Sequence, residues 1–329
     1  MKSDGARRLV FRPAAVATSM GLAVFAVGTA AESLIIRALH GNRQELEWLS
    51  DAVVSIAVTG LSYLWLHLRA SRMRVLTLLQ QQIAIDEQLR LAAEIQRGLL
   101  PDVPNATPGY RWAARMVPAS RIGGDFYDFL ESKDGSVLAI VADVSGKGIP
   151  AALILSSLKT LFRTFARETV EPAAIAEGIA AAFYEQYAGL PYATAIVARF
   201  EAAPRRLVYV NAGHPAGYLL RKGLAPVTLE SGGRPLGLLP GATYVTRNLE
   251  LGPGDVGVLV SDGITEALEA GPTTLSQILA KGERLTTGSS PAEICDVLLR
   301  AAALGSGPAR VSDWQDDRTV FVFSVEPGV

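Results

Sequence analysis

Residues 137–148 read VLAIVADVSGKG: an apolar run that ends at Asp143 and passes directly into the glycine-rich turn Val144–Gly148. A second run with the same plan, VGVLVSDG, occupies residues 256–263 and ends at Asp262. Short apolar runs bounded by turn residues are typical of strands buried on both faces. Each run therefore predicts a core strand that carries a carboxylate at its end.

Further strand-like segments, separated by turn residues, surround these two runs. Together with them, the predicted strands cover residues 110–117, 125–130, 137–143, 193–200, 207–211, 217–220, 243–249, 256–261 and 319–325. Helices are predicted over residues 150–168, 172–189, about 264–269 and 291–304. The strands cluster on both sides of one helical pair instead of alternating with helices. This order favours an antiparallel α+β fold over a doubly wound parallel sheet.

Two apolar runs lie near the N-terminus, over about 14–36 and 52–68, and only Glu32 interrupts the first. Each is close to the roughly 17–25 residues that a membrane-spanning helix needs. Basic residues precede the first run and follow the second, which places both ends in the cytoplasm by the positive-inside rule. We therefore expect residues 1–70 to form a transmembrane helical hairpin in the inner membrane, in contact with lipid. A cleavable signal peptide and a buried soluble hairpin are the alternatives.

Residues 71–100 predict a helical linker that continues from the second apolar run, because no glycine or proline occurs before Gly98. One line of the helix carries mainly apolar residues, at positions 76, 79, 83, 89, 93 and 100, and Gln96 falls in the same line. This pattern fits either a coiled-coil linker that forms a homodimer or a surface helix of the next domain. Prolines at 101, 104 and 108 end the helix and begin a domain over residues 101–329.

The overall composition excludes several classes of protein. Lys+Arg 31 against Asp+Glu 32 leaves a net charge of −1, which argues against nucleic acid as a partner. A single cysteine, Cys295, excludes an intrachain disulfide framework and a cysteine-rich zinc site. The mean hydropathy of +0.26 owes much to the two N-terminal runs, with an Ala- and Val-rich domain adding to it.

Acidic residues recur beside the predicted strands. Asp125 begins one strand, Asp143 and Asp262 end two others, and Asp316 and Asp317 precede the last. A carboxylate at the end of a buried strand is costly without a partner. Each of these residues alone fits a turn or helix cap, but together they indicate one polar site. Carboxylates without histidine or cysteine suit hard cations such as Mg²⁺ or Mn²⁺, and two such ions can promote phosphate ester hydrolysis.

The wording and order of these motifs resemble those of the bacterial PPM-type serine/threonine protein phosphatases of the SpoIIE/RsbU group. The motifs are GGDFYD at 123–128, ADVSGKG at 142–148, NAGHP at 211–215, SDGITEA at 261–267 and DDRTV at 316–320, and EIQRGLLP at 94–101 resembles the helix leading into that domain. The resemblance covers about residues 92–325. It implies a four-layer αββα sandwich, two antiparallel sheets flanked by helices, with two divalent cations, Mn²⁺ or Mg²⁺, at one edge.

The resemblance also implies a role for each matching residue. Asp143 would bridge both cations, and the Val144 carbonyl would be a neighbouring ligand. Asp262 and Asp316 would complete the shell of one cation, and Asp125 would contact the other directly or through water. A metal-bound hydroxide would then attack a phosphoserine or phosphothreonine, without a covalent enzyme intermediate. The implied substrate is a phosphorylated regulatory protein such as a STAS-domain anti-sigma-factor antagonist.

Some positions depart from the wider type 2C pattern. Those relatives carry a histidine just after the bridging aspartate, whereas Val144 follows Asp143 here, so the group that protonates the leaving alkoxide is unassigned. Arg121 is a candidate phosphate-binding residue but fits an ordinary surface arginine equally well, and Asp317 is a weaker candidate ligand.

Two other functional classes compete with a phosphatase. Residues 122–126 superficially resemble a diguanylate-cyclase loop, but that function leaves Asp262 and Asp316 without roles. A catalytically weak or inactive membrane scaffold of the same fold would require lost ligands, yet all matching carboxylates are present.

Several conspicuous residues have simpler structural explanations. His214 in NAGHP is expected to bond a strand end or turn, and Trp112 and Trp314 are expected in the core or turns. Lys147 lacks the full spacing of a phosphate-binding P-loop. Cys295 lies in an apolar helical pattern and is expected to be a packed thiol.

Overall fold

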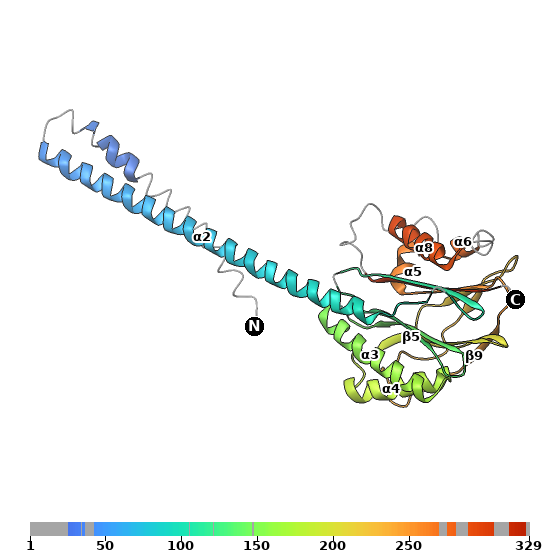
Figure 1. Ribbon diagram of the computed structural model, residues 1–329. Helices are drawn as coiled ribbons and strands as arrows, with labels where there is room; N and C mark the ends of the chain where they lie inside the picture. Colours follow the sequence, from blue (N-terminus) through green and yellow to red (C-terminus); the bar gives the residue numbers. More distant parts are fainter. Residues whose placement is uncertain are drawn as a thin grey trace. The chain divides into compact units, whose positions relative to one another are not determined.

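The computed structural model describes residues 26–33, 35–36, 43–104, 106–120, 122–146, 148–269, 275–280, 289–305 and 316–326 (Figure 1). The chain divides into two compact units, Met1–Asp86 and Glu87–Val329, and each is described by itself.

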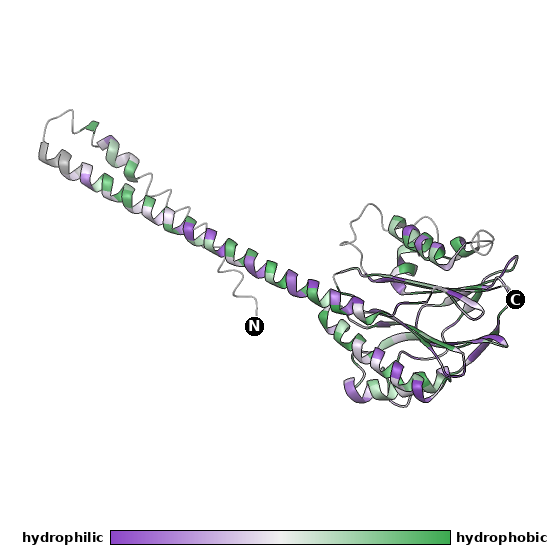
Figure 2. Ribbon diagram, in the orientation of Figure 1, coloured by the Kyte–Doolittle hydropathy of each residue, from purple (hydrophilic) through white to green (hydrophobic). Residues whose placement is uncertain are grey.

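The long helix α2 (Arg43–Leu99) contains both the second apolar run and the predicted linker. Its first part exposes large apolar side chains, including Leu61, Trp65 and Leu66, and hydrophobic residues gather there in Figure 2. A stretch of α2, Ser50–Leu99, is long and apolar enough to cross a membrane, by length and composition alone. Of the first apolar run, residues 26–33 and 35–36 are helical, and the rest lies outside the described residues. The transmembrane hairpin therefore stays a prediction.

Two antiparallel sheets form the centre of the second unit (Figure 1). Sheet A has the order β1 (Ala106–Thr107), β2 (Tyr110–Val117), β11 (Arg318–Val325), β10 (Val256–Val260), β7 (Gly217–Leu220) and β8 (Val227–Leu229). Sheet B has the order β3 (Asp125–Glu131), β4 (Val137–Val144), β5 (Ala193–Ala202), β6 (Arg205–Ala212) and β9 (Arg247–Glu250). Helices α3 (Ile149–Glu168) and α4 (Pro172–Tyr187) pack on sheet B, while α5 (Asp262–Glu269), α6 (Leu275–Ala280) and α8 (Pro291–Gly305) pack on sheet A. The expected antiparallel α+β fold is confirmed.

The alternation of side chains along each strand separates three layers of core. In β4, Val137, Ala139 and Val141 lie in the core between the sheets, whereas Leu138 and Ile140 pack under α3 and α4. Strand β11 alternates in the same way between the central core and the helices on sheet A. Because successive side chains point to opposite faces, a strand covered on both sides must be apolar at nearly every position. This explains the unbroken apolar runs.

Aromatic rings fill the space between the sheets. Trp112 is 2% exposed, and its ring centroid lies 4.8 Å from that of Phe200 and 5.0 Å from that of Phe129, both edge-on. Its Nε1 donates to Thr107 Oγ1 at 2.8 Å, so the one polar atom of the indole is satisfied. Trp112 is therefore a core residue, as expected, and Trp314 lies outside the described residues.

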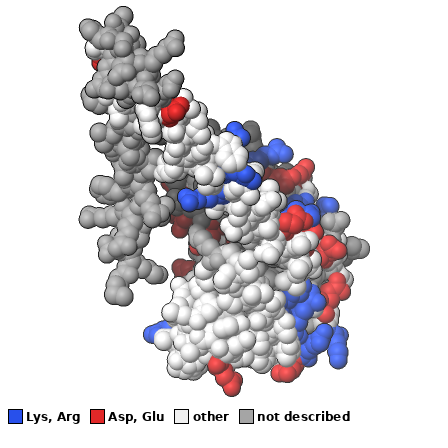
Figure 3. All heavy atoms as spheres, turned by 90° about the vertical axis from the view of Figure 1, so that its left-hand side faces the viewer, with Lys and Arg blue, Asp and Glu red and all other residues white. Residues whose placement is uncertain are grey.

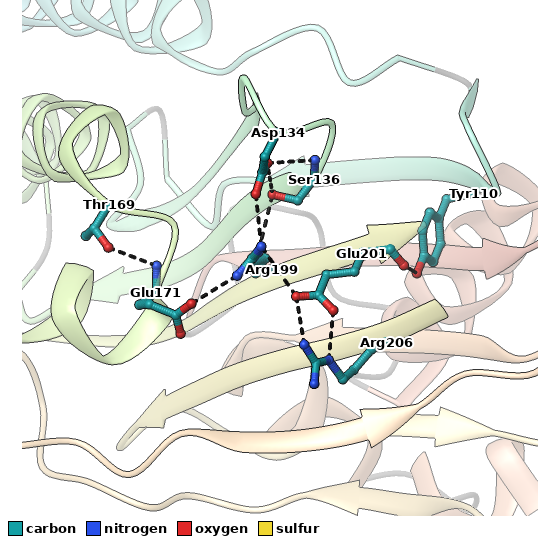
Figure 4. Close-up of polar contacts among 8 residues, drawn as sticks. All are labelled: Tyr110, Asp134, Ser136, Thr169, Glu171, Arg199, Glu201 and Arg206. Carbon is teal, nitrogen blue, oxygen red and sulfur yellow. Dashed lines mark hydrogen bonds and ion pairs between the residues drawn. The ribbon is translucent and has the colours of Figure 1, made fainter. Parts of the chain in front are cut away.

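Polar contacts join α3 and α4 to sheet B. On α3, Arg163 makes a bidentate pair with the fully buried Asp128 of β3, at 2.6 and 2.9 Å. Figure 4 shows a second polar network, which lies at the turn between β3 and β4. There Arg199 on β5 donates to Asp134 in the β3–β4 turn at 2.9 Å and to Glu171 before α4 at 3.0 Å.

The predicted elements differ from the structure mainly where they are short. The strand expected over 243–249 is β9, Arg247–Glu250, since the Tyr244 backbone N–H donates to the Glu177 side chain instead of to a strand. β1, β8 and α6 are not predicted, because they are two, three and six residues long and too short to show a period. Helix α3 is also long and apolar enough to cross a membrane by length and composition, but its buried Leu155, Leu158 and Phe162 pack on sheet B.

Leu158 tests how much the packing of α3 on sheet B stabilises this unit. We expect Leu158→Ala to lower the free energy of unfolding by about 2–5 kcal/mol, because Leu158 is fully buried in the core under α3. The control is Leu153→Ala on the same helix, where the side chain is 66% exposed and a change within about 0.5 kcal/mol is expected. Thermal unfolding of the two variants measures the difference, and equal losses would contradict this packing.

Candidate active site

A row of polar side chains lies at one end of the space between the two sheets. Asp125 begins β3 and pairs directly with Asp143 on β4, which pairs in turn with Thr194 on β5. All three share the face that looks onto sheet A, because the residues two positions further along each strand lie in the central core. Ser261 and Thr319 occupy the corresponding face of sheet A, and their hydroxyls lie close to the Asp125 carboxyl.

Asp125 is an acidic side chain in an unfavourable place for a charge. It is 1% exposed, and within the described residues its Oδ2 atom has no hydrogen-bond partner. Burial raises the pKa of Asp125 well above its usual value, and the charge of Asp143 raises it further. A cation beside the two carboxylates would relieve both effects.

Gly124 allows the backbone to lie close to these carboxylates. A Cβ atom at this position would lie 2.8 Å from the Val144 carbonyl oxygen and 3.1 Å from Asp143 Oδ1. The Gly146 carbonyl oxygen would be 3.6 Å away. The glycine therefore faces a group of oxygen atoms that any side chain would crowd.

Asp317 holds the loop before Asp125. Its Oδ1 accepts a hydrogen bond from the Ala119 backbone N–H at 2.8 Å, and its Oδ2 accepts one from the Gly124 N–H at 2.5 Å. Both carboxylate oxygens are thus engaged with backbone, so the structure gives Asp317 a role in placing the loop.

Asp262 and Asp316 come together through the backbone. Asp262 is the first residue of α5, and a Cβ on the following Gly263 would overlap the Asp317 carbonyl oxygen and lie 3.1 Å from that of Asp316. The first turn of α5 therefore packs directly on the Asp316–Asp317 backbone. Within the described residues, however, no group of three or more His, Cys, Asp or Glu side chains already has metal-binding geometry.

His214 is buried beside this row of polar residues. Its Nδ1 and the Thr194 hydroxyl are hydrogen-bonded at 2.9 Å, and its backbone N–H donates to Asn211 Oδ1 at 2.9 Å. Burial lowers the pKa of His214 to about 4, and the Val260 carbonyl offsets only part of this shift. The ring is neutral near pH 7 and makes the structural contacts expected from the sequence.

The remaining candidates are resolved more simply. Arg121 and Lys147 lie outside the described residues. Burial raises the pKa of the Cys295 thiol to about 12, which confirms a packed thiol and excludes a nucleophile at neutral pH.

Comparison with known proteins identifies the domain. The family model described as "Stage II sporulation protein E (SpoIIE)" matches residues 133–326. The chain belongs to the SpoIIE family. This confirms the resemblance recognised in the motifs.

Individual SpoIIE-family and related proteins show the same similarity. The chain is 31% identical over 186 residues to phosphoserine phosphatase RsbU of Bacillus subtilis, covering 56% of this chain and 55% of that protein. It therefore spans about half the length of this curated relative. The SiaA-PP2C domain of Pseudomonas aeruginosa has the same fold, with a TM-score of 0.64 and 24% identity over 74% of this chain and 98% of that one. RsbX in complex with magnesium shares the fold at a TM-score of 0.51 and 19% identity, over 66% of this chain and 96% of that one.

Sequence reasoning missed part of the site of this SpoIIE-family chain. Thr194, Ser261 and Thr319 lie among the carboxylates, and only their place in the strand alternation could have indicated them. Gln96, in the line of apolar residues on α2, is 4% exposed and bonds the backbone of Gly123. The polar Gln96 among the apolar positions of this helix face was the feature of the sequence that could have indicated a buried polar contact.

His214 predicts a pH dependence of stability. The pKa of His214 is lower in the folded than in the unfolded chain. As the pH falls, the imidazole is therefore protonated in the unfolded chain before it is protonated in the folded chain, which favours unfolding. The contribution of His214 to the free energy of unfolding is fully present above its unfolded pKa of about 6.5. It falls by roughly 3 kcal/mol as the pH drops from about 6.5 to about 4.

The variant His214→Gln removes the titrating group, and we expect its unfolding free energy to fall less over this pH range. Denaturant unfolding of both proteins at several pH values measures the difference. Parallel pH profiles for wild type and variant would contradict a buried neutral histidine.

Proposed function

We propose that this chain is a membrane-anchored, metal-dependent protein phosphatase that hydrolyses phosphoserine or phosphothreonine on a regulatory partner protein. The observation that carries the proposal is the pair of strand-end carboxylates, Asp125 and Asp143, which lie opposite each other with the Gly124 backbone close beside them. Membership of the SpoIIE family and 31% identity to a phosphoserine phosphatase support it.

The site fits divalent cations on its own chemistry. The available donors are carboxylate and carbonyl oxygens, which suit Mg²⁺ and Mn²⁺. A cation would use the buried Oδ2 of Asp125 and the oxygen atoms that face Gly124. A magnesium complex of RsbX, which has the same fold, is consistent with this assignment.

The residues that would hold two cations are the strand-end acids and one carbonyl. Asp143 would bridge the two ions beside the Val144 carbonyl, with Asp125 on one side and Asp262 and Asp316 on the other. When bound, the cations supply Lewis-acid activation of water and of the phosphoryl oxygens. Asp317 fixes the loop that carries Asp125, while the hydroxyls of Ser261 and Thr319 lie close to its carboxyl.

The surface beside the site suits a protein substrate. Ile149 and Leu153 at the start of α3 are 46% and 66% exposed, and Leu190 in the loop after α4 is 74% exposed. This loop is tied to the site, because the Ser145 N–H donates to the Tyr192 carbonyl at 2.9 Å. Figure 3 shows a largely uncharged area on the lower part of this face, with charged residues along its upper and right-hand edges. We propose a phosphorylated protein as the partner, and the family resemblance favours the STAS-domain type.

We further propose the division of the chain into a membrane hairpin over 1–70, a helical linker over 71–100 and a phosphatase domain over 101–329. The phosphatase domain would lie in the cytoplasm. The continuity of α2 and its exposed apolar side chains support this arrangement and a homodimer through the linker. Light scattering of the solubilised chain tests the dimer, which a monomeric mass would contradict.

Asp143→Asn tests the proposed chemistry. The full chain in detergent should release phosphate from p-nitrophenyl phosphate with Mn²⁺ and stop with EDTA, since the cations are proposed to activate the attacking water. Asp143→Asn should lower this activity at least about 100-fold, because it removes the bridging charge. The control is Asp296→Asn, at an exposed position on α8, which should keep wild-type activity. Full activity in Asp143→Asn would overturn the bridging role.

The topology is tested with reporter fusions. A reporter placed after Arg74 should be active only as a cytoplasmic fusion, because the basic residues after the second apolar run remain inside. A reporter inserted between residues 37 and 51 should report the outer side. A cytoplasmic result at both positions would contradict the hairpin.

A further inference from the structure

Gln96 is a buried amide with a specific pair of backbone partners. Its Nε2 donates to the Gly123 carbonyl at 2.5 Å, and its Oε1 accepts from the Gly123 N–H at 3.0 Å. One side chain thus satisfies both polar groups of one residue in the β2–β3 loop. An apolar side chain at this position would leave both groups unpaired and buried, which is costly.

The last turns of α2 that carry Gln96 are firmly attached to the second unit. Leu99 and Leu100 pack against the core under α3, and Ala93 is 8% exposed. Lys159 on α3 donates to the Leu99 carbonyl oxygen, which the end of the helix leaves without a helical partner. Gln96 therefore projects from a fixed support.

The other side of the same loop is held by Asp317. A Cβ on Gly123 would overlap the Asp317 carboxylate, and the next residue, Gly124, donates its N–H to that carboxylate. Gly123 and Gly124 are therefore held between a side chain of α2 and one that precedes β11. Asp125 follows immediately, and Gly124 faces Asp143 Oδ1 and the Val144 carbonyl.

We propose that Gln96 is a positioning residue for the cation site, an inference that rests on the proposed function. It acts through Gly123, and it keeps the Gly123–Gly124 backbone against Asp317 so that Asp125 lies opposite Asp143. Residues that orient ligands in this way change metal affinity or activity by roughly 10–100-fold when they are replaced.

The test uses the full chain in detergent and three variants. Gln96→Met has a similar length but no hydrogen bonds, and Gln88→Met is the matched control, since Gln88 lies on the same helix and is exposed. Asp317→Asn weakens the hydrogen bonds that the Asp317 carboxylate accepts from the backbone of Ala119 and Gly124. Two readouts apply: Mn²⁺ affinity from the electron paramagnetic resonance signal of free Mn²⁺, and amide hydrogen exchange by mass spectrometry.

We expect Gln96→Met to bind Mn²⁺ about 10–100-fold more weakly, while Gln88→Met binds like wild type. Exchange should accelerate over residues 119–125 and stay unchanged over β5 and β6, which shows that the variant is folded. The double variant Gln96→Met, Asp317→Asn should lose less Mn²⁺-binding free energy than the sum of the losses in the two single variants, because both side chains hold the same backbone.

Wild-type Mn²⁺ affinity together with wild-type amide exchange in Gln96→Met would overturn the positioning role. A loss of Mn²⁺-binding free energy in the double variant equal to the sum of the two single losses would overturn it as well. A wild-type chain that binds no Mn²⁺ would instead overturn the metal-dependent function. The exchange rates over 119–125 would then decide the role of Gln96 in the loop by themselves.

Discussion

Asp125 and Asp143 lie directly opposite each other at the ends of two neighbouring strands whose other residues are almost all buried. The antiparallel register between β3 and β4 brings the two carboxylates together, and the alternation of side chains directs both into the space between the sheets. Two acids in such a place repel each other and are poorly solvated. The surrounding structure can be understood as the support for this unfavourable pair.

That support comes from segments far apart in the sequence. Asp317 bonds the loop before Asp125 from the start of β11, and Ser261 and Thr319 bring hydroxyls from sheet A. Thr194 links the row to the neutral His214. The opposite end of sheet B is joined by exposed and half-buried ion pairs around Arg199, which contribute modestly to stability. The two neighbouring carboxylates thus lie at one edge of the sandwich, supported by segments from both sheets.

Much of the fold was predictable because the strands are covered on both faces. A doubly covered strand must be apolar throughout, so β4, β10 and β11 stand out in the sequence with their limits nearly correct. Short elements such as β1 and β8 pair at the sheet edges and leave no pattern long enough to recognise. The predicted start of β9 was wrong, because the Tyr244 backbone N–H donates to the Glu177 side chain, which lies on a different element.

The sequence by itself determined the antiparallel α+β class, the apolar N-terminal runs and the acidic residues beside the strands, since each depends on residues close together in the chain. The tertiary structure decided which of those acids share a space. Strand register set Asp125 against Asp143, and the packing of α5 on the Asp316–Asp317 backbone brought Asp262 to Asp316. It also gave Asp317 its hydrogen bonds to the loop before Asp125 and gave Gln96 its partner. Those contacts join residues up to about 200 positions apart, as between Ala119 and Asp317, and depend on backbone groups that the identity of a residue does not reveal.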